Sequence, residues 1–125
     1  MLSKRKLTKR QELIAMSQKP FDDILEVCKN VSKEWGDDKI VSIATIEAAI
    51  ETVEKNTRTM RGKELKTLKS EFLQTLKALK EICNKKAEEM GRKTIPMSVL
   101  KTYIEHIQKS IAIGAGLEPL NYNKL

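Results

Sequence analysis

The chain has 125 residues, with 24 Lys and Arg against 17 Asp and Glu and a formal net charge of +7. This length predicts one domain, and 40% hydrophobic residues are enough for a buried core, which argues against wholesale disorder. Only 4% of the residues are aromatic and five are Gly, a composition that excludes most sandwiches and barrels and favours helices. We therefore expect an all-α fold, a compact single-domain bundle of four to five helices.

The N-terminal part of the chain is expected to be a basic arm with a short helix near Thr8 to Ser17. No apolar stretch follows its basic run, so we expect no signal peptide. A second helix is predicted between Pro20 and Gly36, because Pro suits a first helical turn and Gly suits a helix end. Its core positions recur with the helical period at Phe21, Ile24, Leu25, Cys28, Val31 and Trp35.

A third helix is predicted from residue 43 towards Met60. Three residues are alternatives for its N-cap, namely Asp38, Ser42 and Thr45. The β-branched run that starts at Ile40 also allows a short extended segment before the helix. The core positions of this helix are Ile43, Ile46, Ile50 and Val53.

The longest helix is predicted near residues 62–90, with a length of roughly 40 Å at 1.5 Å per residue. Gly91 supplies a C-cap, the segment Thr94 to Pro96 interrupts the helical pattern, and a fifth helix follows from about Met97 towards Gly114. The sequence shows no evident internal repeat. The predicted organisation is a basic arm at 1–19, a helical bundle at 20–116 and an irregular tail at 117–125.

Residues suited to catalysis or metal binding are sparse. His106 is the only histidine, which excludes sites with two histidine ligands, and no phosphate-binding loop motif occurs. Cys28 and Cys83 lie in predicted helix cores, which indicates two buried thiols in a reducing compartment, with a disulfide as the alternative. The longest nearly uncharged apolar stretch is about a third of the roughly 20 residues that a membrane-spanning helix needs. We expect no enzymatic activity, no cofactor, no metal and no membrane association.

The charge is unevenly distributed along the chain. Counted as Lys and Arg minus Asp and Glu, it is +5 over residues 1–19, −6 over 20–54, +7 over 55–93 and +1 over 94–125. On a wheel of the longest helix, lysines gather on one flank of the apolar stripe and most glutamates on the other. This lysine stripe contacts an anionic partner, or it is an ordinary solvated face, or it docks the acidic second and third helices. If the stripe is buried against those helices, the nucleic-acid interpretation loses most of its support. The members of the stripe are Lys63, Lys66, Lys69, Lys77 and Lys80.

Basic residues in the arm, on the longest helix and at its two ends are the candidate contacts to phosphates. Lys and Arg that neutralise phosphates gain affinity from the release of counterions. In a eukaryotic cell the N-terminal run would also suit a nuclear import signal. The candidates are Lys4, Arg5, Lys6, Lys9, Arg10, Arg58, Arg61, Lys63, Lys66, Lys69, Lys77, Lys80, Arg92, Lys93 and Lys101.

An Ile-Pro-x-Ser step stands between Thr94 and Leu100. It resembles the start of the recognition helix in some resolvase-like and transposase-like DNA-binding domains, over about 20 residues that begin near Ala87. The resemblance implies a helix-turn-helix in which Arg92, Lys93 and Thr94 lengthen the turn. Its reading face would hold Ser98, Lys101, Thr102 and Glu105.

Together these features predict a small, basic, non-enzymatic nucleic-acid-binding accessory or regulatory protein, located in the cytoplasm or the nucleus. DNA is expected as its partner more than RNA. The alternative is a helical protein–protein adaptor or inhibitor, with a protein partner or a second copy of itself, anchored by Leu73 and Trp35.

Overall fold

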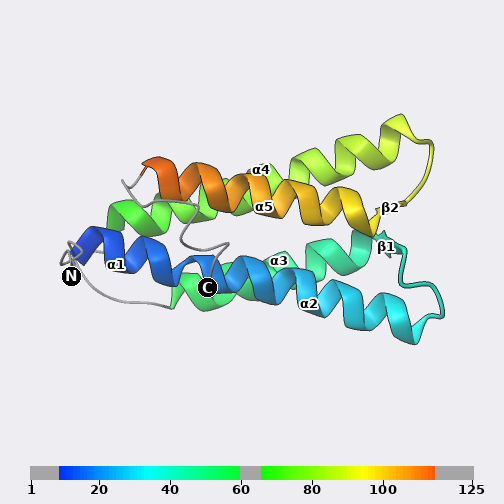
Figure 1. Ribbon diagram of the computed structural model, residues 1–125, viewed down its shortest axis with the longest axis horizontal. Coiled ribbons are helices and arrows are strands. Elements are labelled where there is room, and N and C mark those ends of the chain that lie inside the picture. The colour runs from blue at the N-terminus through cyan, green and yellow to red at the C-terminus, as the bar shows by residue number, and fades with distance from the viewer. Residues whose placement is uncertain (1–8, 60–65, 115–125) are drawn as a thin grey trace, which may run out of the picture.

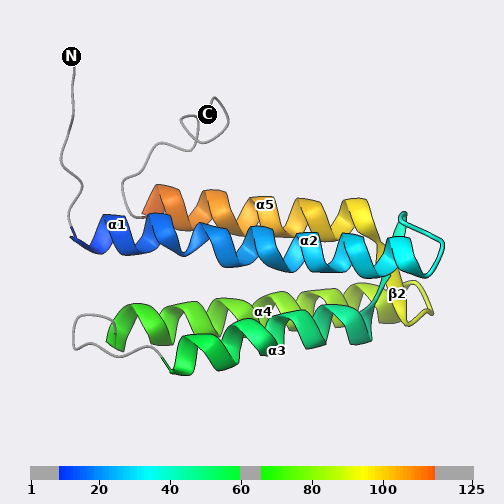
Figure 2. The ribbon, with the colours of Figure 1, turned by 90° about the horizontal axis from the view of Figure 1, so that it is seen from below.

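The computed structural model describes residues 9–59 and 66–114, apart from the side chains of Lys9, Arg10, Leu13 and Thr67. Figures 1 and 2 show the helices of these ranges running lengthwise beside one another, with a two-stranded ribbon at one end. This confirms the predicted all-α helical bundle. In chain order the elements are α1 Lys9–Met16, α2 Gln18–Glu34, β1 Ile40–Ser42, α3 Ile43–Arg58, α4 Lys66–Glu89, β2 Thr94–Pro96 and α5 Met97–Gly114.

The core lies between α2, α3, α4 and α5. Helix α2 packs against α3 and α5, and α4 packs against the same two helices, so α2 and α4 are diagonal neighbours. Each fully buried aliphatic or aromatic side chain stabilises such a core by about 1.5–3 kcal/mol relative to leaving it exposed. The largest fully buried side chains of α2 and α3 include four predicted core residues, Phe21, Ile24, Ile46 and Ile50. Those of α4 and α5 include Leu76, Leu79, Leu100 and Ile104.

One predicted core position is wrong. Trp35 is 73% exposed although its spacing continues the apolar face of α2. The helix ends at Glu34 and Trp35 is its C-cap, so the chain leaves the bundle axis before the indole can turn inward. Helical spacing places Trp35 on the apolar face only in a helix that continues for another turn, and α2 ends before that turn.

The two strands close the core at one end of the bundle. They pair antiparallel, with Ile40 opposite Pro96, Val41 opposite Ile95 and Ser42 opposite Thr94. Val41 and Ile95 are each 1% exposed, so the centre of the ribbon belongs to the core. The alternative of a short extended segment before α3 is therefore confirmed.

Ser42 is the N-cap of α3, which settles the choice among the three predicted caps. Its backbone is extended and its hydroxyl oxygen accepts a hydrogen bond from the Thr45 amide at 3.1 Å. Such a cap satisfies one of the amides that a helix start leaves unpaired.

The fold contains an internal repeat that is not evident in the sequence. The α2–β1–α3 and α4–β2–α5 segments are two helix–strand–helix units with the same backbone hydrogen bonds. Both first helices end in a Schellman motif with a glycine at positive φ, Gly36 at 90° and Gly91 at 65°. The Gly36 amide donates to the Lys33 carbonyl at 3.1 Å, and the Gly91 amide donates to Glu88 at 3.0 Å. One residue further, the amides of Asp37 and Arg92 reach back to Ser32 and Ala87 at 3.1 and 2.9 Å.

The second helices of the units start in the same reciprocal way. The Ile43 amide, at the start of α3, donates to the Lys93 carbonyl at 2.9 Å. The Met97 amide, at the start of α5, donates to the Lys39 carbonyl at 2.7 Å. Each unit thus caps the other around a pseudo-two-fold axis that passes between Val41 and Ile95. Equivalent buried pairs are Phe21 and Leu76, Ile24 and Leu79, Cys28 and Cys83, Ile46 and Leu100, and Ile50 and Ile104.

Candidate nucleic-acid interface

Part of the predicted basic surface lies outside the described residues. The arm residues Lys9 and Arg10 open α1, but their side chains are not described. The candidates that lie wholly outside the described ranges are Lys4, Arg5, Lys6, Arg61 and Lys63.

Two members of the lysine stripe turn towards α3. The Lys69 ammonium donates to the Arg58 carbonyl at 2.8 Å, at the C-terminal end of α3. The Lys80 ammonium lies 3.7 Å from a Glu54 carboxylate oxygen, and their side chains are only 26% and 12% exposed. A cation at a helix C-terminus and an ion pair between neighbouring helices both stabilise the bundle. For Lys69 and Lys80 the docking interpretation is therefore the one that the fold supports.

A polar contact extends this docking towards the ribbon. The Asn84 amide nitrogen donates to a Glu47 carboxylate oxygen at 3.1 Å and to the Lys80 carbonyl at 2.9 Å. The acidic side of α3 thus faces α4 within the same chain. That side is correspondingly less available to a basic surface on a second copy.

The remaining described cations at this part of the bundle point outwards. Arg58, Lys66 and Lys77 are exposed, and none of them forms an ion pair within the described residues. Arg58 ends α3 and Lys66 begins α4, at the end of the bundle where α1 also starts (Figure 2). Lys77 lies three helical turns further along α4. We call these three residues the outer cation edge. It joins Arg58 of α3 to Lys66 and Lys77, the two described stripe lysines that are accessible to phosphates.

The other predicted contacts lie at the opposite end. Arg92 and Lys93 stand in the loop before β2, and Lys101 is exposed on the second turn of α5. Helix α4, with 24 residues and a length of about 36 Å, separates them from Arg58 and Lys66. The candidate residues therefore do not form one continuous surface.

The loop end holds an open groove of about 570 Å³ between the start of α3 and the end of α4. Arg92 and Lys93 line it together with the exposed indole of Trp35, and two carboxylates, Glu47 and Glu88, line it from the helices. The two basic residues are predictable from the sequence, but their combination with the indole is not, because Trp35 and Arg92 are far apart in the chain. A tryptophan directly before a helix-ending glycine was the available signal.

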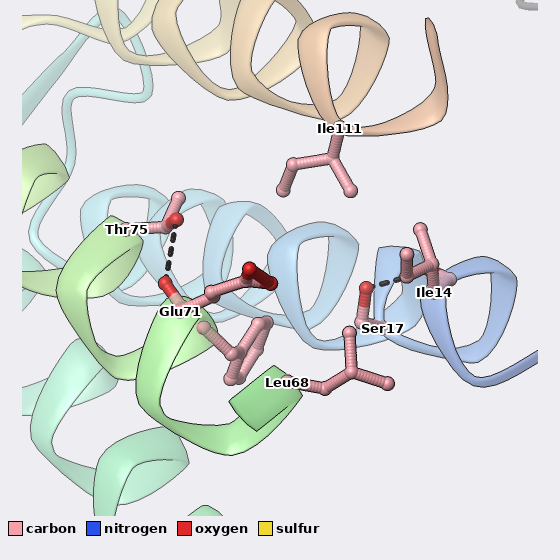
Figure 3. Close-up of a pocket in the computed structure, with 7 residues that line it drawn as sticks. Ile14, Ser17, Leu68, Glu71, Thr75 and Ile111 are labelled. Atoms are coloured by element: carbon pink, nitrogen blue, oxygen red, sulfur yellow. Dashed lines mark hydrogen bonds between the residues drawn. The ribbon is translucent and has the colours of Figure 1, made fainter. Parts of the chain in front are cut away.

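Two further hollows lack such a mixture of groups. A groove of about 390 Å³ follows the outer side of α2 and α3, where Val27, Val31 and Ala48 face it. A pocket of about 90 Å³ lies between the α1–α2 junction, α4 and α5 (Figure 3).

Figure 3 shows that the hydroxyls at this small pocket are engaged locally. Ser17 donates to the Ile14 carbonyl at 2.6 Å, and Thr75 donates to the Glu71 carbonyl at 2.9 Å. Apart from these two hydroxyl residues, Glu71 is the one charged side chain among the lining residues, and the others, such as Leu68 and Ile111, are apolar. It therefore offers few groups that would orient a polar ligand.

The predicted helix-turn-helix takes a different form. The segment Thr94–Pro96, predicted as the end of the turn and the start of the recognition helix, is strand β2 of the ribbon. Helices α4 and α5 run lengthwise past each other (Figures 1 and 2). A DNA-binding helix-turn-helix crosses its helices at about 90–120°. The predicted reading face is nevertheless exposed on α5 at Ser98, Lys101, Thr102 and Glu105.

The described residues contain no group of three His, Cys, Asp or Glu side chains that could hold a metal ion. His106 is exposed on α5. Cys28 and Cys83 are free and fully buried, and burial raises the pKa of each thiol from 9.0 to about 12. Thiols with such pKa values are poor nucleophiles and poor metal ligands near neutral pH.

Comparison of the chain with protein-family models, curated proteins and solved structures gives no match. Within residues 9–59 and 66–114, no helix has the length and apolar character needed to cross a membrane.

Proposed function

We propose that this protein is a small, non-enzymatic nucleic-acid-binding accessory protein that contacts phosphates through the outer cation edge. The observation that carries the proposal is the division of the lysine stripe. Lys69 and Lys80 stabilise the bundle, whereas Arg58, Lys66 and Lys77 stay exposed without an ion pair among the described residues. Exposed cations without an ion pair can neutralise phosphates, and the cations condensed on the nucleic acid are then released, which favours binding.

The basic arm belongs to the same proposal. It enters the bundle through α1, which starts at the end where Arg58 and Lys66 lie (Figure 2). An arm and an edge at one end of a small bundle suit contact with neighbouring phosphates of one strand or duplex. Two free buried thiols accord with a reducing compartment, so we propose a cytoplasmic or nuclear location.

The test measures binding of the full chain to labelled duplex DNA, single-stranded DNA and single-stranded RNA. Fluorescence anisotropy at about 50 mM salt reports the affinity. The double variant Lys66→Glu with Lys77→Glu should bind about tenfold more weakly or worse, because it reverses two phosphate contacts. The matched control is Lys29→Glu with Lys85→Glu. Both control lysines are exposed, and the pair changes the net charge by the same amount.

Absence of binding to all three nucleic acids would refute the proposal. An equal loss in the control pair would refute the outer cation edge, because it would show that only total charge matters. The alternative function, a protein adaptor, would retain Trp35 as an exposed anchor, whereas Leu73 is half-buried against the core. A mass that rises with concentration in light scattering, with no nucleic-acid binding, would favour that alternative.

A further inference from the structure

The pseudo-two-fold repeat separates what the fold needs from what it does not. Both units share the positive-φ glycine, the Schellman hydrogen bonds, the central strand residue and the buried helix positions. A feature that occurs on only one of the two equivalent faces is therefore not required to build the bundle. The groove that contains Trp35 is lined by both units, and its side chains are such a feature.

Equivalent positions show how far the two sides differ. Under the alignment fixed by the loop hydrogen bonds, Trp35 corresponds to Met90, and Arg92 corresponds to Asp37. The two groove carboxylates, Glu47 and Glu88, correspond to lysines at positions 101 and 33. Four side chains of the groove thus differ in chemistry from the residues at the equivalent positions. Three of these four positions carry the opposite charge on the equivalent face.

The groove holds the three kinds of group that recognise a nucleotide. An indole that is 73% exposed offers a face on which a base can stack. Arg92 and Lys93 are the cations at its loop edge, and the N-terminal turn of α3, with its positive dipole end, forms part of its floor. Glu47 supplies carboxylate oxygens, which accept hydrogen bonds from the amino group of cytosine.

The carboxylate is held in place for this role. Asn84 donates to one oxygen of Glu47 at 3.1 Å and is itself anchored to the Lys80 carbonyl at 2.9 Å. A volume of about 570 Å³ is within the usual range for a small-molecule site. The mixture of charges argues against an aliphatic peptide as the occupant and for a ligand that carries both an anion and hydrogen-bond donors.

We propose that this groove binds one nucleotide of a single-stranded nucleic acid. The base stacks on Trp35, its amino group donates to Glu47, and its phosphate lies against Arg92 and Lys93. This rests on the proposed nucleic-acid function and adds to it a preference for single strands and for bases with an amino group.

Trp35 is the only tryptophan in the chain, so intrinsic fluorescence reports on the groove directly. Titration of the full chain with a short single-stranded oligo-dC should quench this fluorescence to a plateau. Trp35→Ala should weaken oligo-dC binding about 5- to 100-fold, as expected for loss of one stacked base, and Trp35→Phe should recover most of it. Ile113→Ala, which removes another exposed apolar side chain (64% exposed), is the matched control and should not change the affinity.

The base preference has its own readout. Cytidine 5′-monophosphate should quench Trp35 at lower concentration than uridine 5′-monophosphate, and Glu47→Gln should narrow that difference. Failure of the proposed function would appear as no anisotropy change with any nucleic acid. Failure of the groove proposal alone would appear as normal oligo-dC binding with unquenched Trp35 and no effect of Trp35→Ala.

Discussion

The buried thiols Cys28 and Cys83 predict a steep loss of stability at alkaline pH. Each thiol has a pKa near 9.0 when exposed and about 12 in the folded protein, because burial opposes the thiolate, and Cys28 adds a repulsive contribution at Cys83. Between pH 9 and 12 the unfolded chain therefore releases protons that the folded chain retains. Proton release from the unfolded state lowers the free energy of unfolding as pH rises. The stabilisation that the two buried neutral thiols provide is therefore fully present only below pH 9.

The size of the effect follows from the two pKa values. One thiol lowers the free energy of unfolding by up to about 1.4 kcal/mol per pH unit in this window. Two thiols together lower it by up to about 2.7 kcal/mol per pH unit. By pH 11 the loss approaches roughly 5 kcal/mol, which is comparable with the whole stability of a small domain. Urea unfolding followed by far-ultraviolet circular dichroism measures it; fluorescence is unsuitable because Trp35 is exposed.

The control is the double variant Cys28→Val with Cys83→Val, which keeps apolar volume and removes both titrating groups. It should lack the steep component between pH 9 and 11, while the burial that raises the pKa of Tyr103 stays common to both proteins. Equal slopes in the wild type and the double variant would refute the burial argument. Rapid reaction of the native thiols with a disulfide reagent at pH 8 would refute it as well.

Three further substitutions test the loop geometry and one of the two docked lysines. Gly36→Ala and Gly91→Ala should each lower the free energy of unfolding by about 1–2 kcal/mol in urea unfolding, because both glycines have positive φ. Nothing lies within 4 Å of an added Cβ at either site, so the cost comes from the backbone alone. A loss of stability at one site only would contradict the equivalence of the two units. Lys80→Met should lower the free energy of unfolding by up to about 1 kcal/mol, because it removes the ion pair with Glu54. Its oligonucleotide affinity should stay within twofold of the wild type. A large loss of affinity with unchanged stability would show that Lys80 contacts the nucleic acid.

The helical elements were predictable because their apolar residues recur with the helical period. The ends of α2 and α4 were predictable as well, since Gly36 and Gly91 suit the positive φ that a Schellman motif requires. The ribbon was predictable only as an option at Ile40, because β-branched residues permit an extended segment but do not name its partner.

The repeat escaped sequence analysis because its two halves share burial and backbone conformation more than residue identity. Phe21 and Leu76 occupy equivalent buried sites, and the equivalent loops differ in length by one residue, which shifts the register of any direct comparison. The candidate site was predictable to the same limited degree. A helical wheel sorts Lys69 and Lys77 onto one flank, but only the neighbouring helix shows that Lys69 caps α3 and Lys77 stays exposed.

The salt dependence of nucleic-acid affinity tests the central claim most directly. Each phosphate neutralised contributes a slope of about −0.7 for single strands in a plot of log affinity against log salt concentration. Three contacts from Arg58, Lys66 and Lys77 therefore predict a slope of about −2 or steeper for the wild type, and Lys66→Met with Lys77→Met should reduce its magnitude by about 1.4. An equal slope in the double variant, or no measurable binding at about 50 mM salt, would contradict the claim that the outer cation edge binds phosphates.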